Sequence, residues 1–378
     1  MEKIKLAIFA SHPIQYQAPF FKAINLDGRI KPTVYFSDRG AIEESYDSEF
    51  GRKIKWDIPL LDGYEHFFLK GRMHLPLILL FKKTRFDAIL IFGWNSIDIF
   101  LVYLAALFSG TKILMRAESP LNQELLKFGV FQKAKKIFLK LFFKKIKAFL
   151  YIGEENRRFY KYLGVPDSRL FFVPYAVDND RFFKEAEVLL PKKEEIRDGM
   201  GIKRDAKVVL FVGKLIDKKR PKDLLVAYKD LDIKNKALIF VGDGSLRQEL
   251  EDYVQKNNLS GVYFVGFKNQ TEISEYYAIA DVFVLPSGAG ETWGLVVNEA
   301  MCFGLPVVVS NLVGCGLDLV NNDNSGYIFK MGDIKEMKEV ILRAFSLADK
   351  KEKNQSRSLI KNYDYSRGIN SIVSVLKD

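Results

Sequence analysis

Cysteine and histidine are scarce in this chain of 378 residues, and their scarcity excludes several classes of protein. The 2 Cys, Cys302 and Cys315, are too few for a secreted disulfide framework or a four-ligand zinc site, and they fit a reducing compartment. With only 3 His, His12, His66 and His74, a multi-histidine metal site is not expected. The sequence also lacks Pro-rich tracts, Gly-rich repeats and internal repeats.

Long apolar runs are missing as well. The longest, Ile97–Phe108, contains Asp98 and is shorter than the roughly 20 residues that a membrane-spanning helix needs. The N-terminal residues Met1–Ile4 lead directly into an apolar run, without a signal-peptide cleavage pattern. We therefore expect a cytoplasmic protein that is soluble or peripheral to a membrane.

The residues that are present favour two folded domains with an uneven charge. Apolar residues make up 48% and charged residues 28%, which is enough to bury a sizeable core, and the length suits two domains. The net charge is +11, and residues 1–180 hold 28 basic and 19 acidic side chains, whereas 181–378 hold 30 and 28. The first half should therefore have an anionic partner: a nucleic acid, an acidic membrane or a phosphorylated ligand.

Compact apolar runs alternate with stretches of helical period, which is typical of parallel sheets with crossover helices. The expected strands are 5–10, 32–36, 88–92, 112–116, 148–152 and 170–173, and then 208–212, 237–241, 262–265, 282–285 and 306–309. The predicted fold class is α/β, with two doubly wound, Rossmann-like domains that bind ligands in a cleft at the carboxyl ends of their strands. The expected boundaries are 1–182, a linker at 183–204, 205–355, and a C-terminal helix at 356–378, whose packing on the first domain the sequence leaves open.

The stretch 286–301 predicts an anion site in the second half. A strand ends at Ser287, a glycine-rich loop follows, and a helix begins near Gly294, where free N–H groups and the helix dipole favour a phosphate. Glu299 lies on the first turns of that helix and could accept hydrogen bonds from a vicinal diol such as ribose. Glu291 lies on the loop that should face the cleft. The alternative interpretation is an ordinary loop with solvated carboxylates.

Two further loops support the anion site. Lys214 and Lys219 follow the first strand of the second half, after Gly213, and could hold a diphosphate as point charges. A solvated lysine loop is the alternative. The turn 241–245, Val-Gly-Asp-Gly-Ser, lacks the full dinucleotide fingerprint and is weak evidence for a nicotinamide cofactor.

Taken in order, these elements resemble the nucleotide-binding domain of the retaining glycosyltransferases of family 4. The matching segments are 213–219, 241–244, 265–267, 280–287, the Glu-x7-Glu pattern from Glu291 to Glu299, and 300–308, with a weaker match of 11–17 to one bacterial branch. The resemblance implies the GT-B architecture, a nucleoside diphosphate sugar as donor and a glycan or lipid-linked hydroxyl as acceptor.

The resemblance also implies a role for each matching residue. Lys214 and Lys219 would hold the diphosphate. The family often has Arg at the position of Lys214, and Lys keeps the positive charge of Arg but lacks its bidentate guanidinium. Glu291 would contact the transferred sugar and Glu299 the ribose. The backbone of residues 294–296, Gly294, Leu295 and Val296, would donate to the phosphates. Phe267 and Lys268 lie where the base is usually held.

The first half offers weaker candidates. His12 follows the first strand, where many relatives have a Gly-rich loop, and it would either touch donor or acceptor or have a simple loop role. Glu118 would contact the acceptor hydroxyl or the sugar, and Arg116 would lie near the acceptor; a structural Arg116–Glu118 pair is the alternative. Trp94 would stack on an acceptor sugar or serve only in packing.

Two further patterns concern metal and membrane. Asp178–Asp180 and Asp230–Asp232 both spell Asp-x-Asp, but chance matches are expected in such a chain, so no metal or other cofactor is predicted. Leu125–Leu150 contains eight Lys, six Phe and no acidic residue, which resembles a helix at an anionic membrane surface. A packed helix with a solvated basic face is the alternative, and nucleic-acid binding is not expected because no recognised module surrounds the run.

The sequence therefore predicts a retaining glycosyltransferase of the cytoplasmic face of a membrane, in glycan or polysaccharide synthesis. Its catalytic candidates are Glu291, Glu118 and His12. A phosphorylase or a sugar-nucleotide epimerase on the same fold is the alternative enzyme, although an epimerase would need acid and base groups that the few histidines hardly supply. A non-catalytic, membrane-binding scaffold is the alternative outside enzymes.

Overall fold

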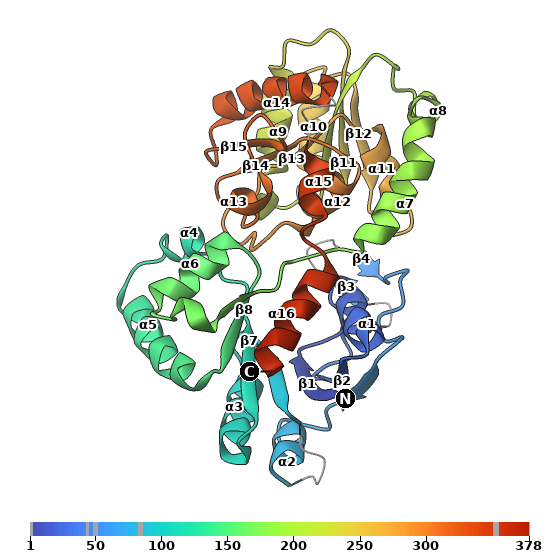
Figure 1. Ribbon diagram of the computed structural model, residues 1–378. Coiled ribbons are helices and arrows are strands. Elements are labelled where there is room, and N and C mark those ends of the chain that lie inside the picture. The colour runs from blue at the N-terminus through green and yellow to red at the C-terminus, as the bar shows by residue number, and fades with distance from the viewer. Residues whose placement is uncertain (1–2, 43–44, 48–51, 82–85, 351–354, 378) are drawn as a thin grey trace. The chain divides into compact units, whose positions relative to one another are not determined.

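The computed structural model describes residues 3–42, 45–47, 52–81, 86–350 and 355–377. It divides into two compact units, each built on a sheet with helices on both faces (Figure 1). The first unit comprises residues 1–45, 58–175 and 364–378, and the second comprises 46–57 and 176–363. The second unit thus includes residues 46–57 and 176–182, which were predicted for the first domain, the predicted linker 183–204, and the start of the predicted C-terminal helix, 356–363.

The first unit contains a seven-stranded sheet in the order β5-β2-β1-β6-β7-β8-β9, in which every described pairing is parallel. Its strands are β1 (Ile4–Ala10), β2 (Ile30–Phe36), β5 (Glu65–Phe68), β6 (Ala88–Phe92), β7 (Lys112–Arg116), β8 (Ala148–Tyr151) and β9 (Leu170–Phe172). Its helices are α1 (Ala18–Asp27), α2 (His74–Phe81), α3 (Ile97–Ser109), α4 (Leu121–Glu124), α5 (Val130–Phe142), α6 (Glu154–Tyr162) and α16 (Tyr365–Lys377).

Both faces of this sheet are covered, so its strands are apolar at successive positions rather than at alternate ones. On β1, Leu6 and Ile8 pack on the face covered by α1 and α16, while Ala7 and Phe9 pack on the face covered by α2, α3, α5 and α6. Helix α16 lies beside α1 and β9 (Figure 1). The last helix of the chain thus completes the core of the first unit.

The second unit contains a six-stranded parallel sheet in the order β12-β11-β10-β13-β14-β15. Its strands are β10 (Lys207–Val212), β11 (Lys236–Val241), β12 (Val262–Gly266), β13 (Val282–Leu285), β14 (Val307–Ser310) and β15 (Gly326–Phe329). Its helices are α7 (Asn179–Leu189), α8 (Lys193–Gly199), α9 (Pro221–Lys229), α10 (Arg247–Lys256), α11 (Ile273–Ile279), α12 (Leu295–Cys302), α13 (Gly316–Leu319), α14 (Ile334–Asp349) and α15 (Ser356–Ile360). A separate pair of short strands is β3 (Ser45–Asp47) and β4 (Arg52–Ile54).

The eleven expected strands are all present, with ends shifted by about two residues or less. Strands β5 and β15 and the short pair β3 and β4 were not predicted from the sequence. Strand β5 is only partly buried and so lacks a continuous apolar signal, and β15 begins at Gly326 and spans four residues. Both missed strands lie at the edges of their sheets, where patterning is weakest.

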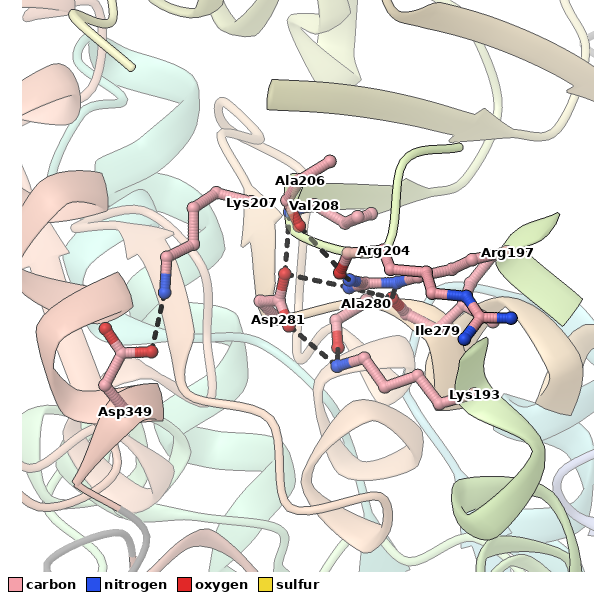
Figure 2. Close-up of polar contacts among 10 residues, drawn as sticks. All are labelled: Lys193, Arg197, Arg204, Ala206, Lys207, Val208, Ile279, Ala280, Asp281 and Asp349. Carbon is pink, nitrogen blue, oxygen red and sulfur yellow. Dashed lines mark hydrogen bonds and ion pairs between the residues drawn. The ribbon is translucent and has the colours of Figure 1, made fainter. Parts of the chain in front are cut away.

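The predicted linker at 183–204 is in fact part of the second unit. Asp281, at the start of β13, accepts hydrogen bonds from Lys193 at 2.7 Å, from Arg197 at 2.9 Å and from the amide of Val208 at 2.8 Å (Figure 2). Burial would raise the pKa of Asp281, but Lys193 and Arg197 hold it below its ordinary value. The charges that made this stretch look like a linker therefore fasten α8 to the sheet.

Candidate functional site

The second sheet reverses its strand order between β10 and β13, and the predicted donor-site loops leave the carboxyl ends of these two strands. In open parallel sheets ligands bind at such a switch point, because the loops on either side turn in opposite directions and leave a crevice. The loop after β10 carries Lys214 and Lys219, and the loop after β13 carries Glu291. The topology thus supports the predicted location.

The loop after β10 is closely packed on its neighbour after β11. The amide of Gly213 donates to the carbonyl of Val241 at 2.9 Å, and a Cβ at Gly242 would lie only 1.9 Å from the carbonyl oxygen of Gly213. Only glycine fits at 242, so the Gly-Asp-Gly turn serves the packing of the two loops. This gives the turn a structural reason that requires no nicotinamide cofactor.

Lys219 and Glu291 meet although 72 residues separate them. The ammonium of Lys219 pairs with Oε2 of Glu291, and the hydroxyl of Ser287 donates to the same oxygen at 3.1 Å. Their side chains retain 17% and 11% of their exposure, so the pair is largely shielded from water. Two groups predicted for diphosphate and sugar therefore lie at one place.

The backbone holds these two loops together. The amide of Gly288 donates to the carbonyl of Lys218 at 2.8 Å, which joins the loop after β13 to the loop after β10. From the other side, the amide of Gly314 donates to the carbonyl of Glu291 at 3.1 Å, and that of Cys315 donates to the carbonyl of Trp293 at 3.0 Å. The loop after β14 thus supports the backbone around Glu291.

Helix α12 begins at Leu295, with Gly294 as its N-cap residue, which agrees with the predicted start near Gly294. This residue has φ 97° and ψ 62°, in the left-handed region that favours glycine, and a Cβ there would lie 2.9 Å from Leu285. Within the described residues no side chain caps the helix, and Leu295 and Val296 are half-buried. The first amides of α12 therefore have the geometry of an anion site, at the positive end of the helix dipole.

Glu299 is buried on α12 rather than solvated. Oε2 accepts a hydrogen bond from the hydroxyl of Tyr277 at 2.6 Å, and Gln270 also hydrogen-bonds the carboxyl. Burial raises the pKa of Glu299, while Tyr277, Arg181 and Gln270 act in the opposite direction. The structure thus excludes the alternative of a solvated carboxylate at this position and gives the side chain a fixed set of neighbours.

The residues around Glu299 were not predicted from the sequence. Arg181 donates to the main-chain oxygen of Gln270 at 2.7 Å and to its side-chain oxygen at 2.6 Å, and Glu185 lies 3.4 Å from the same guanidinium. Arg181 is on α7, inside the segment assigned to the first domain. No local signal connects α7 to α11 and α12, so this network could be found only in the folded structure.

The first Asp-x-Asp motif has a local structural role. The carboxylate of Asp178 accepts from the amide of Arg181 at 3.1 Å and caps α7, as an Asp at this position commonly does. Among the described residues, no group of three or more His, Cys, Asp or Glu is placed to hold a metal ion.

Phe267 and Lys268 lie on the loop after β12. Lys268 donates to Glu272 at 3.2 Å, and its ammonium lies 5.8 Å from the ring of Tyr276. The ring of Phe267 lies 6.0 Å from that of Trp56, which comes from the segment 46–57. Lys214, for its part, is half-buried on the loop after β10.

In the first unit, the structure buries one of the two residues predicted beside the acceptor. Arg116 is the last residue of β7 and is only 5% exposed, with its guanidinium 4.9 Å from the ring of Tyr175 and 5.7 Å from that of Phe20. Burial lowers the pKa of Arg116. The rings of Phe20 and Tyr175 cover the guanidinium, so the structure favours a structural role for Arg116 over direct contact with an acceptor.

Glu118 remains half-buried after β7, and the hydroxyl of Tyr175 donates to its carboxylate. Within the described part of the chain, no direct ion pair joins Arg116 to Glu118. The ring of Tyr175 contacts Arg116 and its hydroxyl contacts Glu118, while the charge of Glu118 acts on Arg116 without a hydrogen bond between them. Tyr175 was not predicted as a site residue, because it follows β9 and belongs to no recognisable motif.

His12 and Trp94 have mainly structural neighbours. The hydroxyl of Ser11 lies 3.0 Å from Nδ1 of His12, which is half-buried after β1. The ring of Trp94 stacks on Phe159 at 5.5 Å with an angle of 12° and lies 5.9 Å from Phe143. These contacts favour the packing role of Trp94 over stacking on a sugar.

The basic run Leu125–Leu150 forms α5, a short 3-10 turn and β8, rather than one helix. Its large apolar side chains are unusually exposed: Phe131 is 90%, Phe128 87% and Val130 80% exposed. Of its lysines, Lys135 pairs with Glu124 at 2.6 Å, while the exposed ones are Lys127, Lys133, Lys140, Lys144, Lys145 and Lys147. Among the described residues no helix is both long and apolar enough to cross a membrane.

The two Rossmann-like units define the GT-B architecture, as predicted. The structure of the Anabaena protein HepE in complex with UDP matches with a TM-score of 0.74 and 16% identity, covering 100% of both chains. Residues 192–362 match the model of the family "Glycosyl transferases group 1", which confirms the resemblance of the second unit to glycosyltransferases.

Two curated relatives are also named as glycosyltransferases. An uncharacterized glycosyltransferase of Methanocaldococcus jannaschii is 36% identical over 146 residues, or 38% of this chain and 37% of that protein. The UDP-Gal:alpha-D-GlcNAc-diphosphoundecaprenol alpha-1,3-galactosyltransferase of Escherichia coli is 30% identical over 200 residues, or 50% of this chain and 49% of that protein. The chain thus spans half or less of the length of these two relatives.

Proposed function

We propose that this protein is a retaining glycosyltransferase that moves a sugar from a nucleoside diphosphate sugar to a hydroxyl of a glycan or lipid-linked acceptor. The observation that carries the proposal is the meeting of Lys219, Glu291 and the start of α12 at the switch point of the second sheet. The UDP in the Anabaena structure and the UDP-galactose in the name of the Escherichia coli relative support a uridine nucleotide.

The donor site would act through electrostatics. The diphosphate is a dianion or stronger, and it offers the ammonium of Lys219 a better acceptor than the single carboxylate of Glu291. The first amides of α12 would donate to the same diphosphate, and Lys214 would add a second positive charge. Glu291, released from Lys219, would then contact the transferred sugar. Glu299 would accept hydrogen bonds from the ribose.

The proposed reaction needs no protein base. The bond between the anomeric carbon and the phosphate oxygen breaks, the acceptor oxygen forms its bond on the same face, and the departing diphosphate takes the acceptor proton. Lys214, Lys219 and the helix start would stabilise the charge that develops on the diphosphate. We therefore propose that the enzyme requires no metal ion.

The first unit would hold the acceptor and attach to the membrane. Phe128, Val130 and Phe131 expose apolar surface beside exposed lysines, and this combination suits the boundary between anionic head groups and acyl chains. The Escherichia coli relative is named for a lipid-linked acceptor, diphosphoundecaprenol. We propose a peripheral position on the cytoplasmic face of a membrane and a role in glycan or polysaccharide synthesis.

The test is incubation of the purified protein with a panel of nucleoside diphosphate sugars, with slow donor hydrolysis as the readout. Release of the free nucleoside diphosphate from one donor supports a transferase, and the anomeric configuration of the product reports retention. Release of sugar phosphate would indicate a phosphorylase instead, and conversion of one nucleotide sugar into another would indicate an epimerase. Absence of any turnover and of nucleotide binding would favour the scaffold.

A further inference from the structure

The loop after β12 contacts a segment from the far N-terminal part of the chain. This segment is Lys55–Asp57, named here the strap, and it follows β4. The side-chain amide of Asn269 donates to the carbonyl of Lys55 at 2.8 Å, and the carboxylate of Asp57 accepts from the amide of Thr271 at 3.1 Å. Both ends of the strap are therefore hydrogen-bonded to the loop after β12.

Trp56 lies between these two attachments. Its ring meets that of Phe267 at 6.0 Å and 62°, in the edge-to-face arrangement that aromatic pairs favour. Both rings are half-buried, whereas Lys55 and Asp57 on either side of Trp56 are exposed. The strap thus holds one large aromatic side chain against the loop, and both aromatic residues remain partly exposed.

The same loop continues directly to the neighbours of Glu299. Gln270 hydrogen-bonds the carboxyl of Glu299 and is itself held by Arg181. If Glu299 binds the ribose, the group attached to that ribose, the nucleobase, must lie beside this loop. Nucleobases are flat π systems that stack on aromatic side chains, largely irrespective of which base is present.

We propose that Trp56, together with Phe267, forms an aromatic wall that contacts the base of the donor nucleotide, and that Asp57 and Asn269 position it. The inference rests on the proposed donor site and adds to it a contact from outside the segment that matches the family model. It assigns the strap a role in binding nucleosides rather than in binding phosphate.

The test compares UDP with inorganic pyrophosphate by calorimetry, because only UDP carries a base. Trp56→Ala should bind UDP about ten-fold more weakly, which corresponds to about 1.4 kcal/mol and lies within the range for loss of one stacked base. Trp56→Phe should bind it nearly as well as the wild type. Pyrophosphate affinity should stay the same in both variants.

Two further variants distinguish loss of the contact between Trp56 and the base from general damage to the binding site. Asp57→Ala keeps Trp56 but removes an attachment of the strap, and it should weaken UDP binding in the same direction. Phe183→Ala removes a half-buried aromatic side chain from α7, where it contacts Arg357 and Lys361, and should leave both affinities unchanged.

Equal binding of UDP by Trp56→Ala and the wild type would overturn the inference while the donor site stands. A parallel loss of UDP and pyrophosphate would also overturn it, because that pattern reports damage to the whole site. A wild-type protein that binds pyrophosphate but no UDP, ADP or GDP would contradict the aromatic wall and the donor assignment together.

Discussion

The carboxyl ends of the two sheets differ in what they offer a ligand. In the second unit, Lys219 pairs with Glu291 at the strand-order reversal, helix α12 with Glu299 begins just after Glu291, and neighbouring loops are joined by backbone hydrogen bonds. In the first unit, Arg116 is buried and Trp94 packs on Phe159, so that fewer of the predicted groups are accessible. The first unit instead exposes apolar and basic side chains on α5.

This difference has a chemical reason. A nucleotide has the same diphosphate and ribose whatever sugar it carries, so the groups that bind it can follow a motif, and the family model covers this unit. An acceptor surface need only match one particular acceptor. A general motif is therefore informative for the second unit and much less so for the first.

Among the substitutions that test this difference between the two units, Glu291→Gln should have the largest effect, and that effect should be on turnover. Removal of this charge should lower turnover by roughly 10²- to 10³-fold, the range for loss of one group that stabilises a transition state. UDP affinity should change little, because the proposed partner of Glu291 is the sugar. Steady-state kinetics and calorimetry measure the two effects separately.

Ser287→Ala serves as the milder control for Glu291→Gln, since Ser287 only donates to the same carboxylate. Normal turnover of Glu291→Gln would contradict the proposed role of Glu291 in the reaction. A collapse of UDP affinity in the same variant would assign it to the nucleotide instead.

Asp281→Asn tests whether α8 is part of the second unit. Loss of the charge should leave Arg197 buried without its partner and destabilise the unit by roughly 3 kcal/mol. Because the folded pKa of Asp281 lies below the ordinary value of 3.8, the wild-type stabilisation is present above that pH and is lost as the pH falls through the folded pKa.

Urea unfolding at several pH values measures this effect. The difference in the free energy of unfolding between the wild type and Asp281→Asn should be largest near neutral pH and should decrease below about pH 4. An exposed ion pair offers the control: Lys222→Met, which breaks the pair with Glu249, should leave the free energy of unfolding nearly unchanged. Equal stability of the wild type and Asp281→Asn at neutral pH would mean that α8 is not held through this carboxylate.

Lys219→Ala should weaken UDP binding without abolishing folding. Loss of a charge-assisted contact to the diphosphate is expected to cost about 1.5–3 kcal/mol. Part of the loss is offset, because the wild-type lysine must first leave Glu291. Calorimetry with UDP gives the value, and Lys218→Ala, on the same loop but more exposed, is the matched control. Undiminished affinity of Lys219→Ala would place the diphosphate elsewhere.

The smallest effect per substituted residue is expected for the lysines of the first unit that are proposed to bind the membrane. A basic residue near anionic lipid contributes about 1 kcal/mol, and salt screens it. Charge reversal of four exposed lysines should release the protein from anionic vesicles: Lys133, Lys140, Lys144 and Lys145. Lys135 is unsuitable because it pairs with Glu124.

Co-sedimentation with vesicles measures release. The matched control reverses four exposed lysines of the second unit, with the same change in net charge: Lys234, Lys256, Lys335 and Lys350. Equal loss of binding in both quadruple variants would show that only the overall charge matters. Wild-type protein that stays in solution at low salt would leave the exposed side chains of α5 without a membrane role.

Much of the second unit could be predicted because its signals are local. A strand, a glycine-rich turn and a helix start follow one another within a few residues, so Gly294 and Lys219 could be placed from sequence alone. Arg116 shows the limit: the strand was predicted correctly, but the burial of its last side chain depends on Phe20 and Tyr175, which come from distant parts of the chain.

By itself, the sequence determined the α/β class, the order of the strands along the chain, the loops that carry Lys219 and Glu291, and the helix that carries Glu299. These features depend on residues that are neighbours in the chain. Only the tertiary structure decided that Arg181 and Tyr277 surround Glu299, that α16 completes the first core, and that Trp56 meets Phe267. Such contacts bring together segments separated by tens to hundreds of residues, and they arise from packing, which leaves no periodic or local pattern in the chain.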